Sequence, residues 1–392
     1  MLKGMKMLER LHIENYKCLR DITVDLGDFT ILVGPNDSGK SSFMQAVRAL
    51  DLMLGKSFPK NFNQNVLGTL VWRHHRDQRI KWDVTGRAAE RGFHYKVELP
   101  ADGGPPIEDL VVDQTRTVLT EKAESHGQSM LVNKLLNGGQ QQQSQALPGS
   151  TFLARNRQAD PYKTIARALS SSIEYRFDVD LLKKAAVPKQ GDVLSFNGEN
   201  LAAVLDIMQN SADRSDFDAL QGSFKEAVPT LDRFILPPAR NGHGKVLEFV
   251  LAGGSVPPVT IPASQVSTGA LLLMAFLTIA YSCTADVLLI EEPENGLHPS
   301  RLEFVVNQLR KICSGEIGGR KRQVIITTHS PLLLNYAMPE EVRVFIRRDN
   351  TLGSQVQTMK DIPDLEDLRK EFSTGELWYL LGENKLFEEN RT

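Results

Sequence analysis

A glycine-rich segment near the start of the chain has residue types suited to phosphate binding. Gly34 to Ser41 fits the pattern G-x-x-x-x-G-K-[ST], directly after the apolar run Phe29 to Val33 and before a segment with helical spacing. Backbone N–H groups of such a loop point at phosphates, and the following helix N-terminus adds partial positive charge. The pattern predicts that Lys40 reaches the β- and γ-phosphates of a nucleotide and that Ser41 binds Mg²⁺. The expected nucleotide contacts are Gly34, Pro35, Asn36, Asp37, Ser38, Gly39, Lys40, Ser41 and Ser42.

A second segment ends an apolar run with two carboxylates. Val287 to Pro293 reads VLLIEEP, and the carboxyl end of a parallel strand lies at the ligand-binding edge of its sheet. Adjacent strand residues face opposite ways, so both acids can point at one atom only if the backbone bends. We expect Glu291 to hold Mg²⁺, directly or through water, and Glu292 to face the γ-phosphate and polarise the attacking water. Taken alone, the segment also fits a solvated acidic turn.

Two further segments carry weaker signals. The apolar run Val324 to Thr328 ends at His329, which is placed to sense or stabilise a γ-phosphate, although a lone histidine in a turn is often structural. Ser267 and Gly269 precede a buried helical pattern, and a hydroxyl with bare backbone at a helix start forms an anion site. The adjacent pair His74-His75 has no such context and is expected at the surface.

The remaining sequence must position these segments. Helix and strand patterns alternate at both ends of the chain, while residues 70–120 read as antiparallel hairpins and residues 160–230 as helical. Residues 137–150 are rich in glutamine, which favours a mobile surface loop, with a partner-binding tract as the alternative. The pattern predicts a split α/β nucleotide-binding domain with a β-rich and a helical insertion.

Charge balance, cysteine spacing and apolar runs bear on DNA binding, on the redox compartment and on membrane association. Of 392 residues, 46 are Lys or Arg and 48 are Asp or Glu, so DNA contact needs a local basic patch. The cysteines at 18, 283 and 313 lie far apart, which argues against a disulfide scaffold or a zinc site and favours a reducing cytosol. The first ten residues show no apolar signal-peptide region, and no apolar run approaches the ~18 residues of a membrane span. A cytoplasmic protein without a membrane partner is predicted.

The order of these motifs resembles the head of the ATP-binding-cassette (ABC) ATPases. More narrowly, the chain resembles the SMC-related and OLD-like (overcoming-lysogenization-defect) P-loop ATPases, a group often called AAA-type. The narrower resemblance rests on LHIENYKC from Leu11, GPNDSGKS from Gly34, EEPENGLHP from Glu291 and TTHSP from Thr327. It covers about residues 1–50 and 260–350, with a weaker likeness at Asn197 to Leu205.

The resemblance implies an α/β fold: an ABC-ATPase-like head with a mixed or parallel core sheet, an antiparallel β subdomain and a helical insertion. The expected divisions are a head of residues 1–60 and 230–350, a β-rich part of 61–150, a helical insertion of 151–229, and a tail of 351–392. The tail carries Trp378 and Tyr379 and is expected to pack on the head, with partner docking as the alternative.

The resemblance also implies a site shared between two chains. Two ATP molecules with Mg²⁺ would be sandwiched in a head-to-tail homodimer. Each phosphate loop would face Ser267–Gly269 of the other chain. Such dimers could also assemble into a higher oligomer. Lys17 matches a position near the phosphates, and Gln158 is the candidate for the Q-loop. The chain departs from the ABC pattern at Thr268, Ala270, Glu291 and His298, which leaves the hydrolysis rate open.

For function, the resemblance implies an ATPase that acts as a nucleotide-dependent dimeric switch. Its expected setting is bacterial antiphage defence or a DNA-related complex, with a separate effector that is a nuclease or a toxin, and with double-stranded DNA as a possible ligand. The alternative is an ATP-loaded scaffold with little turnover that sequesters a toxic effector. Full OLD proteins carry a C-terminal Toprim nuclease, and since only 63 residues follow His329, no nuclease domain is expected here.

Overall fold

The computed structural model describes residues 8–54, 64–74, 78–88, 91–102, 106–113, 115–123, 129–135, 143–145, 151–155, 162–240, 242–253, 257–347, 353–362 and 365–378. The chain divides into two compact units, and each is described by itself. Unit 1 comprises Met1–Ile173, Pro339–Glu371 and Leu380–Thr392, and unit 2 comprises Glu174–Met338 and Phe372–Tyr379.

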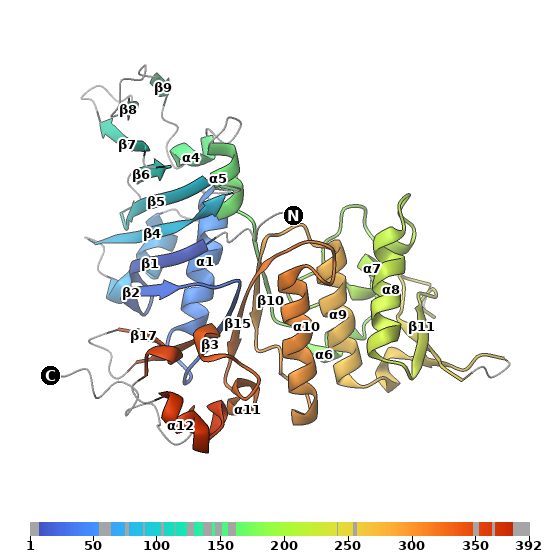
Figure 1. The fold of residues 1–392 in the computed structure, drawn as a ribbon. Coiled ribbons are helices and arrows are strands. Elements are labelled where there is room, and N and C mark those ends of the chain that lie inside the picture. Colours follow the sequence, from blue (N-terminus) through green and yellow to red (C-terminus); the bar gives the residue numbers. More distant parts are fainter. Residues whose placement is uncertain are drawn as a thin grey trace. The chain divides into compact units, whose positions relative to one another are not determined.

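Unit 1 contains an eight-stranded antiparallel sheet, drawn in blue to teal in Figure 1. Ile80, Trp82 and Val84 are buried on one face of a central strand, as the alternating pattern requires. The predicted hairpins between residues 70 and 120 are confirmed, and Gln143–Gln145 adds a short edge strand, while the rest of 137–150 lies outside the described residues. The strands, in spatial order, are β2 (Leu19–Asp25), β1 (Leu8–Tyr16), β4 (Arg79–Ala88), β5 (Arg91–Pro100), β6 (Ile107–Val112), β7 (Thr115–Ala123), β8 (Ser129–Leu135) and β9 (Gln143–Gln145).

The helix that follows the phosphate loop, α1 (Lys40–Leu54), packs against two groups of strands in unit 1. Its Ala46 carbonyl accepts a hydrogen bond from Trp82 Nε1 on β4 at 3.1 Å, and its Phe43 ring lies 5.8 Å from that of Phe345. Phe345 belongs to β16 (Val342–Ile346), which pairs in parallel with the wholly buried β3 (Phe29–Val33) and antiparallel with β17 (Gln355–Thr358). The other helices among the described residues of unit 1 are α3 (Gln64–Leu70), η1 (Trp72–His74), α4 (Phe152–Arg155), α5 (Tyr162–Leu169), η4 (Pro339–Glu341), η5 (Met359–Asp361) and α12 (Leu365–Glu371).

Unit 2 is built around α9 (Thr268–Ser282), in which every residue from Ala270 to Ala280 is buried. Its strands β14 (Val287–Glu291) and β15 (Gln323–Thr328) pair in parallel, and β10 (Ser172–Tyr175), whose last two residues begin the unit, lies on the other side of β14. Both parallel strands are almost wholly buried, which explains why they read as continuous apolar runs. The buried helix and both strands match the sequence prediction.

Shorter elements complete unit 2. Among the described helices of the whole chain, none combines the length and apolarity needed to cross a bilayer. Residues 374–378 group with this unit, where the Gly375 amide donates to Asn335 Oδ1 at 2.8 Å and Leu377 is buried. The domain boundaries expected from the sequence stay a prediction. The other elements are α6 (Val179–Leu182), α7 (Leu201–Gln209), α8 (Ser215–Ala227), β11 (Leu231–Ile235), β12 (Glu248–Leu251), β13 (Thr260–Pro262), η2 (Ala263–Gln265), η3 (Pro299–Arg301), α10 (Leu302–Ser314) and α11 (Pro331–Leu334).

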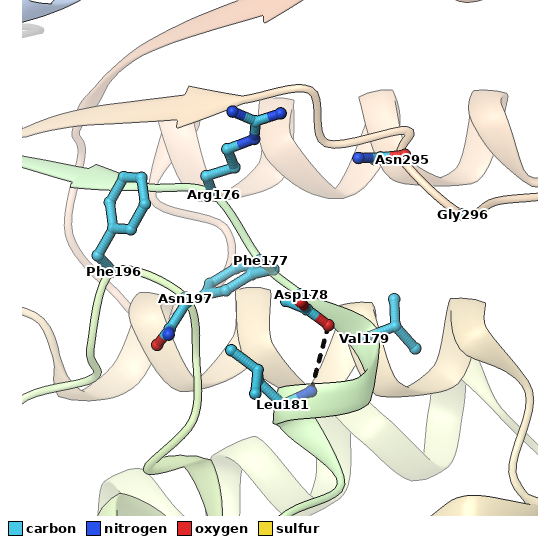
Figure 2. A pocket seen from close by; sticks show the side chains of 9 residues that line it. All are labelled: Arg176, Phe177, Asp178, Val179, Leu181, Phe196, Asn197, Asn295 and Gly296. Atoms are coloured by element: carbon cyan, nitrogen blue, oxygen red, sulfur yellow. Dashed lines mark hydrogen bonds between the residues drawn. The ribbon is translucent and has the colours of Figure 1, made fainter.

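A cavity of about 600 Å³ opens in unit 2 between the segment that leaves β10 and the turn that follows β14 (Figure 2). Two hydrogen bonds fix one wall, because the Arg176 amide donates to the Phe196 carbonyl at 2.8 Å and the Asp178 amide donates to the Asn197 carbonyl at 3.2 Å. The lining residues are Arg176, Phe177, Asp178, Val179, Leu181, Phe196, Asn197, Asn295 and Gly296.

Candidate functional site

The phosphate loop needs both of its glycines. A Cβ at Gly34 would lie 2.1 Å from the Phe345 carbonyl oxygen, so only glycine allows the loop to run this close to β16. Gly39 has a φ of +108°, a conformation that residues with a Cβ rarely adopt. The loop then turns directly into α1 at Lys40. The predicted order of strand, loop and helix is therefore present, with the loop geometry that the motif requires.

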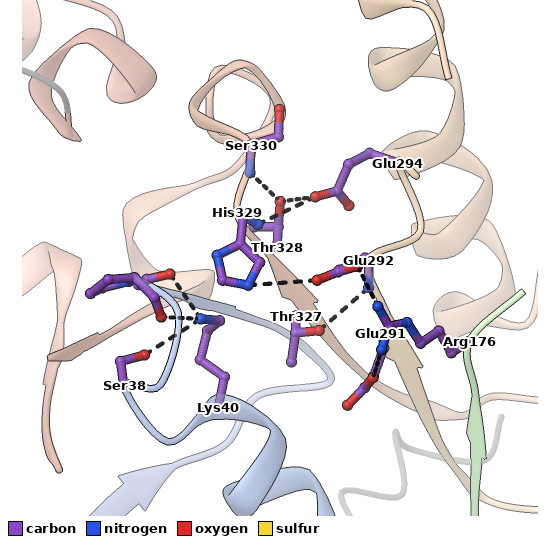
Figure 3. A network of polar contacts seen from close by, with 12 residues as sticks. Ser38, Lys40, Arg176, Glu291, Glu292, Glu294, Thr327, Thr328, His329 and Ser330 are labelled. Carbon is purple, nitrogen blue, oxygen red and sulfur yellow. Dashed lines mark hydrogen bonds and ion pairs between the residues drawn. The ribbon is translucent and has the colours of Figure 1, made fainter. Parts of the chain in front are cut away.

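Lys40 is held inside the loop. Its side chain is 4 % exposed, and Nζ donates to the carbonyl oxygens of Gly34 at 2.8 Å and Pro35 at 2.7 Å (Figure 3). The next residue, Ser41, is exposed at the first turn of α1. Ser42 Oγ accepts a hydrogen bond from Cys18 Sγ at 3.2 Å, which ties the helix start to the β1–β2 turn. The loop thus fixes a buried ammonium group with its own backbone and leaves one hydroxyl exposed.

Lys17 lies in the β1–β2 turn, where its φ is +51°. Its Nζ donates to Oε1 of Gln45, and its backbone amide donates to the Leu70 carbonyl at 2.6 Å. Gln45 lies one helical turn beyond Ser41, so the two residues share a face of α1. The Lys17 ammonium is therefore held on the face of α1 that also carries the predicted magnesium ligand.

In unit 2, the backbone bends at Glu292. Glu291 is the last residue of β14, and Glu292 has a φ of +47°, an uncommon conformation for a residue that is not glycine. Its amide donates to the Thr327 carbonyl at 3.0 Å, which anchors the bend to the end of β15. A strained backbone residue that its surroundings hold in place is typical of functional sites. This is the bend that two adjacent acids need if both are to serve one site.

Two side chains, an imidazole and a guanidinium, lie close to the Glu292 carboxylate. His329 Nε2 lies 3.6 Å from Glu292 Oε1, and Arg176 Nη2 lies 3.3 Å from Glu292 Oε2 (Figure 3). Arg176 also approaches Glu291, with Nη1 at 3.7 Å from Oε2. Glu291, Glu292 and His329, which were predicted to act together, are thus brought together within unit 2. Sequence reasoning missed Arg176, because a single arginine after a strand carries no motif.

A second missed residue, Glu294, connects the two loops of this cluster. Its Oε1 accepts hydrogen bonds from Thr328 Oγ1 and from the His329 amide, the latter at 3.3 Å. Burial raises the pKa of the Glu294 carboxyl, although those two hydrogen bonds and one from its own backbone amide oppose the shift. The carboxyl group therefore fixes the position of the histidine loop. Glu294 lies within the EEPENGLHP segment that the sequence analysis singled out. Its hydrogen bond to Thr328, 34 residues later, could not be predicted from that motif.

Ser267 is the N-cap of α9. Its Oγ accepts a hydrogen bond from the Ala270 amide at 3.3 Å, and the residue is exposed. A Cβ at Gly269 would meet Leu297 at 3.6 Å, so this glycine faces the turn after β14. His298 also caps a helix, since its Nδ1 accepts from the Ser300 amide at 3.3 Å. The structure thus gives Ser267 and His298 capping contacts, and anion binding by Ser267 stays a prediction.

Some predicted positions fall outside the described residues, namely Gln158, His75 and Tyr379. Among the residues that are described, no group of three or more His, Cys, Asp or Glu side chains could hold a metal ion. A magnesium ion bound with a nucleotide needs fewer protein ligands, because Mg²⁺ keeps several waters and takes oxygens from the phosphates. The exposed hydroxyl of Ser41 and the carboxylate of Glu291 are hard oxygen donors of that kind.

Two family models match the chain. The model described as "AAA domain, putative AbiEii toxin, Type IV TA system" matches residues 159–335, and the model described as "AAA ATPase domain" matches residues 5–126. The OLD nuclease of Thermus scotoductus is 23 % identical over 397 residues, covering 94 % of this chain and 68 % of its own length. The predicted resemblance to OLD-like, SMC-related ATPases of the ABC type is confirmed.

Two further similarities are to SMC proteins. The chromosome partition protein Smc of Methanocaldococcus jannaschii is 34 % identical over 71 residues, which is 18 % of this chain and 6 % of that protein. A crystal structure of an Smc head bound to the C-winged helix domain of ScpA has a TM-score of 0.51 at 14 % identity, covering 89 % of this chain and 96 % of that one. This likeness confirms the predicted ABC-ATPase-like fold.

Proposed function

We propose that the chain binds ATP with Mg²⁺ through the phosphate loop and hydrolyses it, with Glu292 polarising the attacking water. The observation that carries the proposal is the Glu292 bend, which holds a carboxylate at the end of a buried strand beside His329. A carboxylate accepts a proton from water, and a neighbouring histidine stabilises developing negative charge. Lys40 supplies a full positive charge to the β- and γ-phosphates.

Magnesium binding is assigned to Ser41 and Glu291. The ion would bridge phosphate oxygens and neutralise the charge that develops on them. The test is ATP turnover with Mg²⁺ and with EDTA, for the wild type, Glu292→Gln and the control Glu303→Gln, an exposed acid on α10 of the same unit. We expect ATP turnover only with Mg²⁺. Glu292→Gln should lose this turnover, and the control Glu303→Gln should keep the wild-type rate. Equal rates in all three proteins would overturn the catalytic role of Glu292, and equal rates with Mg²⁺ and with EDTA would overturn the requirement for magnesium.

We further propose that ATP closes a head-to-tail homodimer in which Ser267–Gly269 of one chain meets the phosphate loop of the other. Support comes from the exposed position of Ser267 at the start of the 15-residue helix α9, where backbone dipoles favour an anion.

The Smc head of known structure binds a winged-helix domain of ScpA, and the matched AAA model refers to a toxin system. These features support a separate partner protein. Our proposal that this partner is a nuclease or a toxin, in a bacterial antiphage or DNA-related complex, rests on the resemblance to OLD-like ATPases.

A second candidate function is an ATP-loaded scaffold with little turnover that sequesters a toxic effector. The ion pairs of Arg176 with both glutamates favour it, because the carboxylates that hydrolysis needs are engaged. Turnover with and without double-stranded DNA separates the two candidates. A rate that DNA stimulates supports the switch, and a rate near zero under both conditions supports the scaffold.

A further inference from the structure

Arg176 bridges the two glutamates that the proposed function assigns to metal binding and to catalysis. Its two terminal nitrogens lie 3.7 Å from Glu291 and 3.3 Å from Glu292, so one guanidinium serves two carboxylates. The Glu291 side chain is 11 % exposed and that of Glu292 is 27 % exposed, whereas that of Arg176 is 51 % exposed. Partly buried carboxylates of like charge repel one another, and the arginine offsets this repulsion.

A divalent cation on Glu291 would stand close to the same guanidinium. Two positive charges a few ångströms apart at a partly buried carboxylate repel, and the carboxylate oxygens cannot fully serve both. We propose that Arg176 is a positioning residue that competes with the divalent cation for the Glu291–Glu292 pair and is displaced when the cation binds. This inference rests on the proposed function, because it takes Glu291 as the magnesium ligand.

The surroundings of Arg176 allow this displacement. Its backbone is fixed by the hydrogen bond to Phe196, so the side chain can turn without moving the strand end. Arg176 is one of the residues that line the 600 Å³ cavity, so the side chain has space on that side once it leaves the glutamates (Figure 2). The half-exposed guanidinium also regains water contacts there, which lowers the cost of breaking both ion pairs.

The competition has a thermodynamic signature that does not depend on turnover. It is the ratio of nucleotide dissociation constants measured in EDTA and in Mg²⁺, since this ratio reports how much the metal strengthens nucleotide binding. The probe is the non-hydrolysable analogue AMP-PNP carrying a fluorescent MANT group. The proteins are the wild type, Arg176→Gln, Arg176→Lys and Arg214→Gln. Arg214 is a matched control, since it is also 51 % exposed in unit 2 and pairs with one acid, Asp218, at 3.5 Å.

We expect the EDTA-to-Mg²⁺ ratio of dissociation constants to rise about fivefold in Arg176→Gln. In this variant the metal no longer has to break a half-exposed ion pair, so it strengthens nucleotide binding more. Arg176→Lys keeps the charge and should stay near the wild-type ratio, as should Arg214→Gln. Thermal melting of each variant shows whether it is folded. If Arg176→Gln is not folded, Arg176→Met, which also removes the charge, takes its place with the same expected rise in the ratio.

Two results would overturn the inference. An unchanged ratio in Arg176→Gln would mean that metal and arginine do not compete. Weaker binding by the same factor in EDTA and in Mg²⁺ would mean that Arg176 contacts the phosphates instead. Failure of the proposed function looks different, because the wild type would then not bind the probe, or Lys40→Ala would bind it equally well.

Discussion

The phosphate loop and the acidic end of β14 differ in how far along the chain their contacts reach. The Lys40 ammonium is held by carbonyls five and six residues away. Glu292 is held by Thr327, His329 and Arg176, which lie 35 to 116 residues away. The Lys40 contacts stay intact as long as the loop backbone keeps its conformation. The acidic cluster keeps its geometry only while strands and loops from distant parts of unit 2 stay packed.

The largest effect is expected at the loop. Lys40→Ala removes the one side-chain cation that the loop encloses, while its backbone geometry is set by Gly34 and Gly39. Since hydrogen bonds to charged groups are the strong ones, nucleotide affinity should fall about 10²-fold or more. Fluorescent nucleotide titration measures it, with the exposed Lys163→Ala of the same unit as control. Normal affinity in Lys40→Ala would remove the phosphate-loop assignment.

The acidic cluster should respond in rate rather than in affinity. Glu292→Gln keeps the size of the side chain but accepts a proton far less readily, so kcat should fall about 10²-fold while ATP still binds. The variant should accumulate as a closed dimer in ATP and Mg²⁺, which size-exclusion chromatography detects. If hydrolysis continues at the normal rate, the catalytic role passes to another residue, with Glu291 the next to test.

Ser267 extends the comparison to a second chain. Ser267→Arg places a large side chain at the exposed start of α9, where the proposed dimer leaves no room beside the opposing loop. ATP affinity of the monomer should stay almost unchanged, while dimer formation in ATP is lost. Mixing this variant with Lys40→Ala should restore at most one composite site. Loss of ATP binding by the monomer would show that the segment belongs to the pocket of its own chain.

The smallest effect is expected at Glu294, and it concerns stability. Because burial raises the pKa of Glu294 in the folded protein, the folded state binds a proton more tightly than the unfolded state. Stability therefore falls as pH rises from the unfolded pKa of a glutamate to the raised folded value. Glu294→Gln should flatten the plot of melting temperature against pH in the region just above about pH 4, the ordinary pKa of a glutamate. The same slope in both proteins would contradict the assignment.

The sequence predicted those features that depend on residues close together in the chain. The buried strands β3, β14 and β15, the apolar helix α9 and the antiparallel hairpins follow from local periodicity, and the loop from its glycines. Arg176 and Glu294 were missed because their partners are chosen by strand packing, and one sequence does not show which distant residues meet. The same limit applies to Ser267, whose capping bond is local but whose proposed partner is in another chain.

The hydrogen bond from Trp82 to Ala46 bears on how chains of this kind can vary in length. It fixes α1 to β4, and each strand from β4 to β9 pairs with the next one in sequence. A hairpin gained or lost at the β9 edge therefore leaves every pair between β2 and β4 intact, along with the helix that carries the phosphate loop. We expect insertions and deletions among related chains to accumulate at this edge, where evolution can attach new surfaces without altering nucleotide contacts.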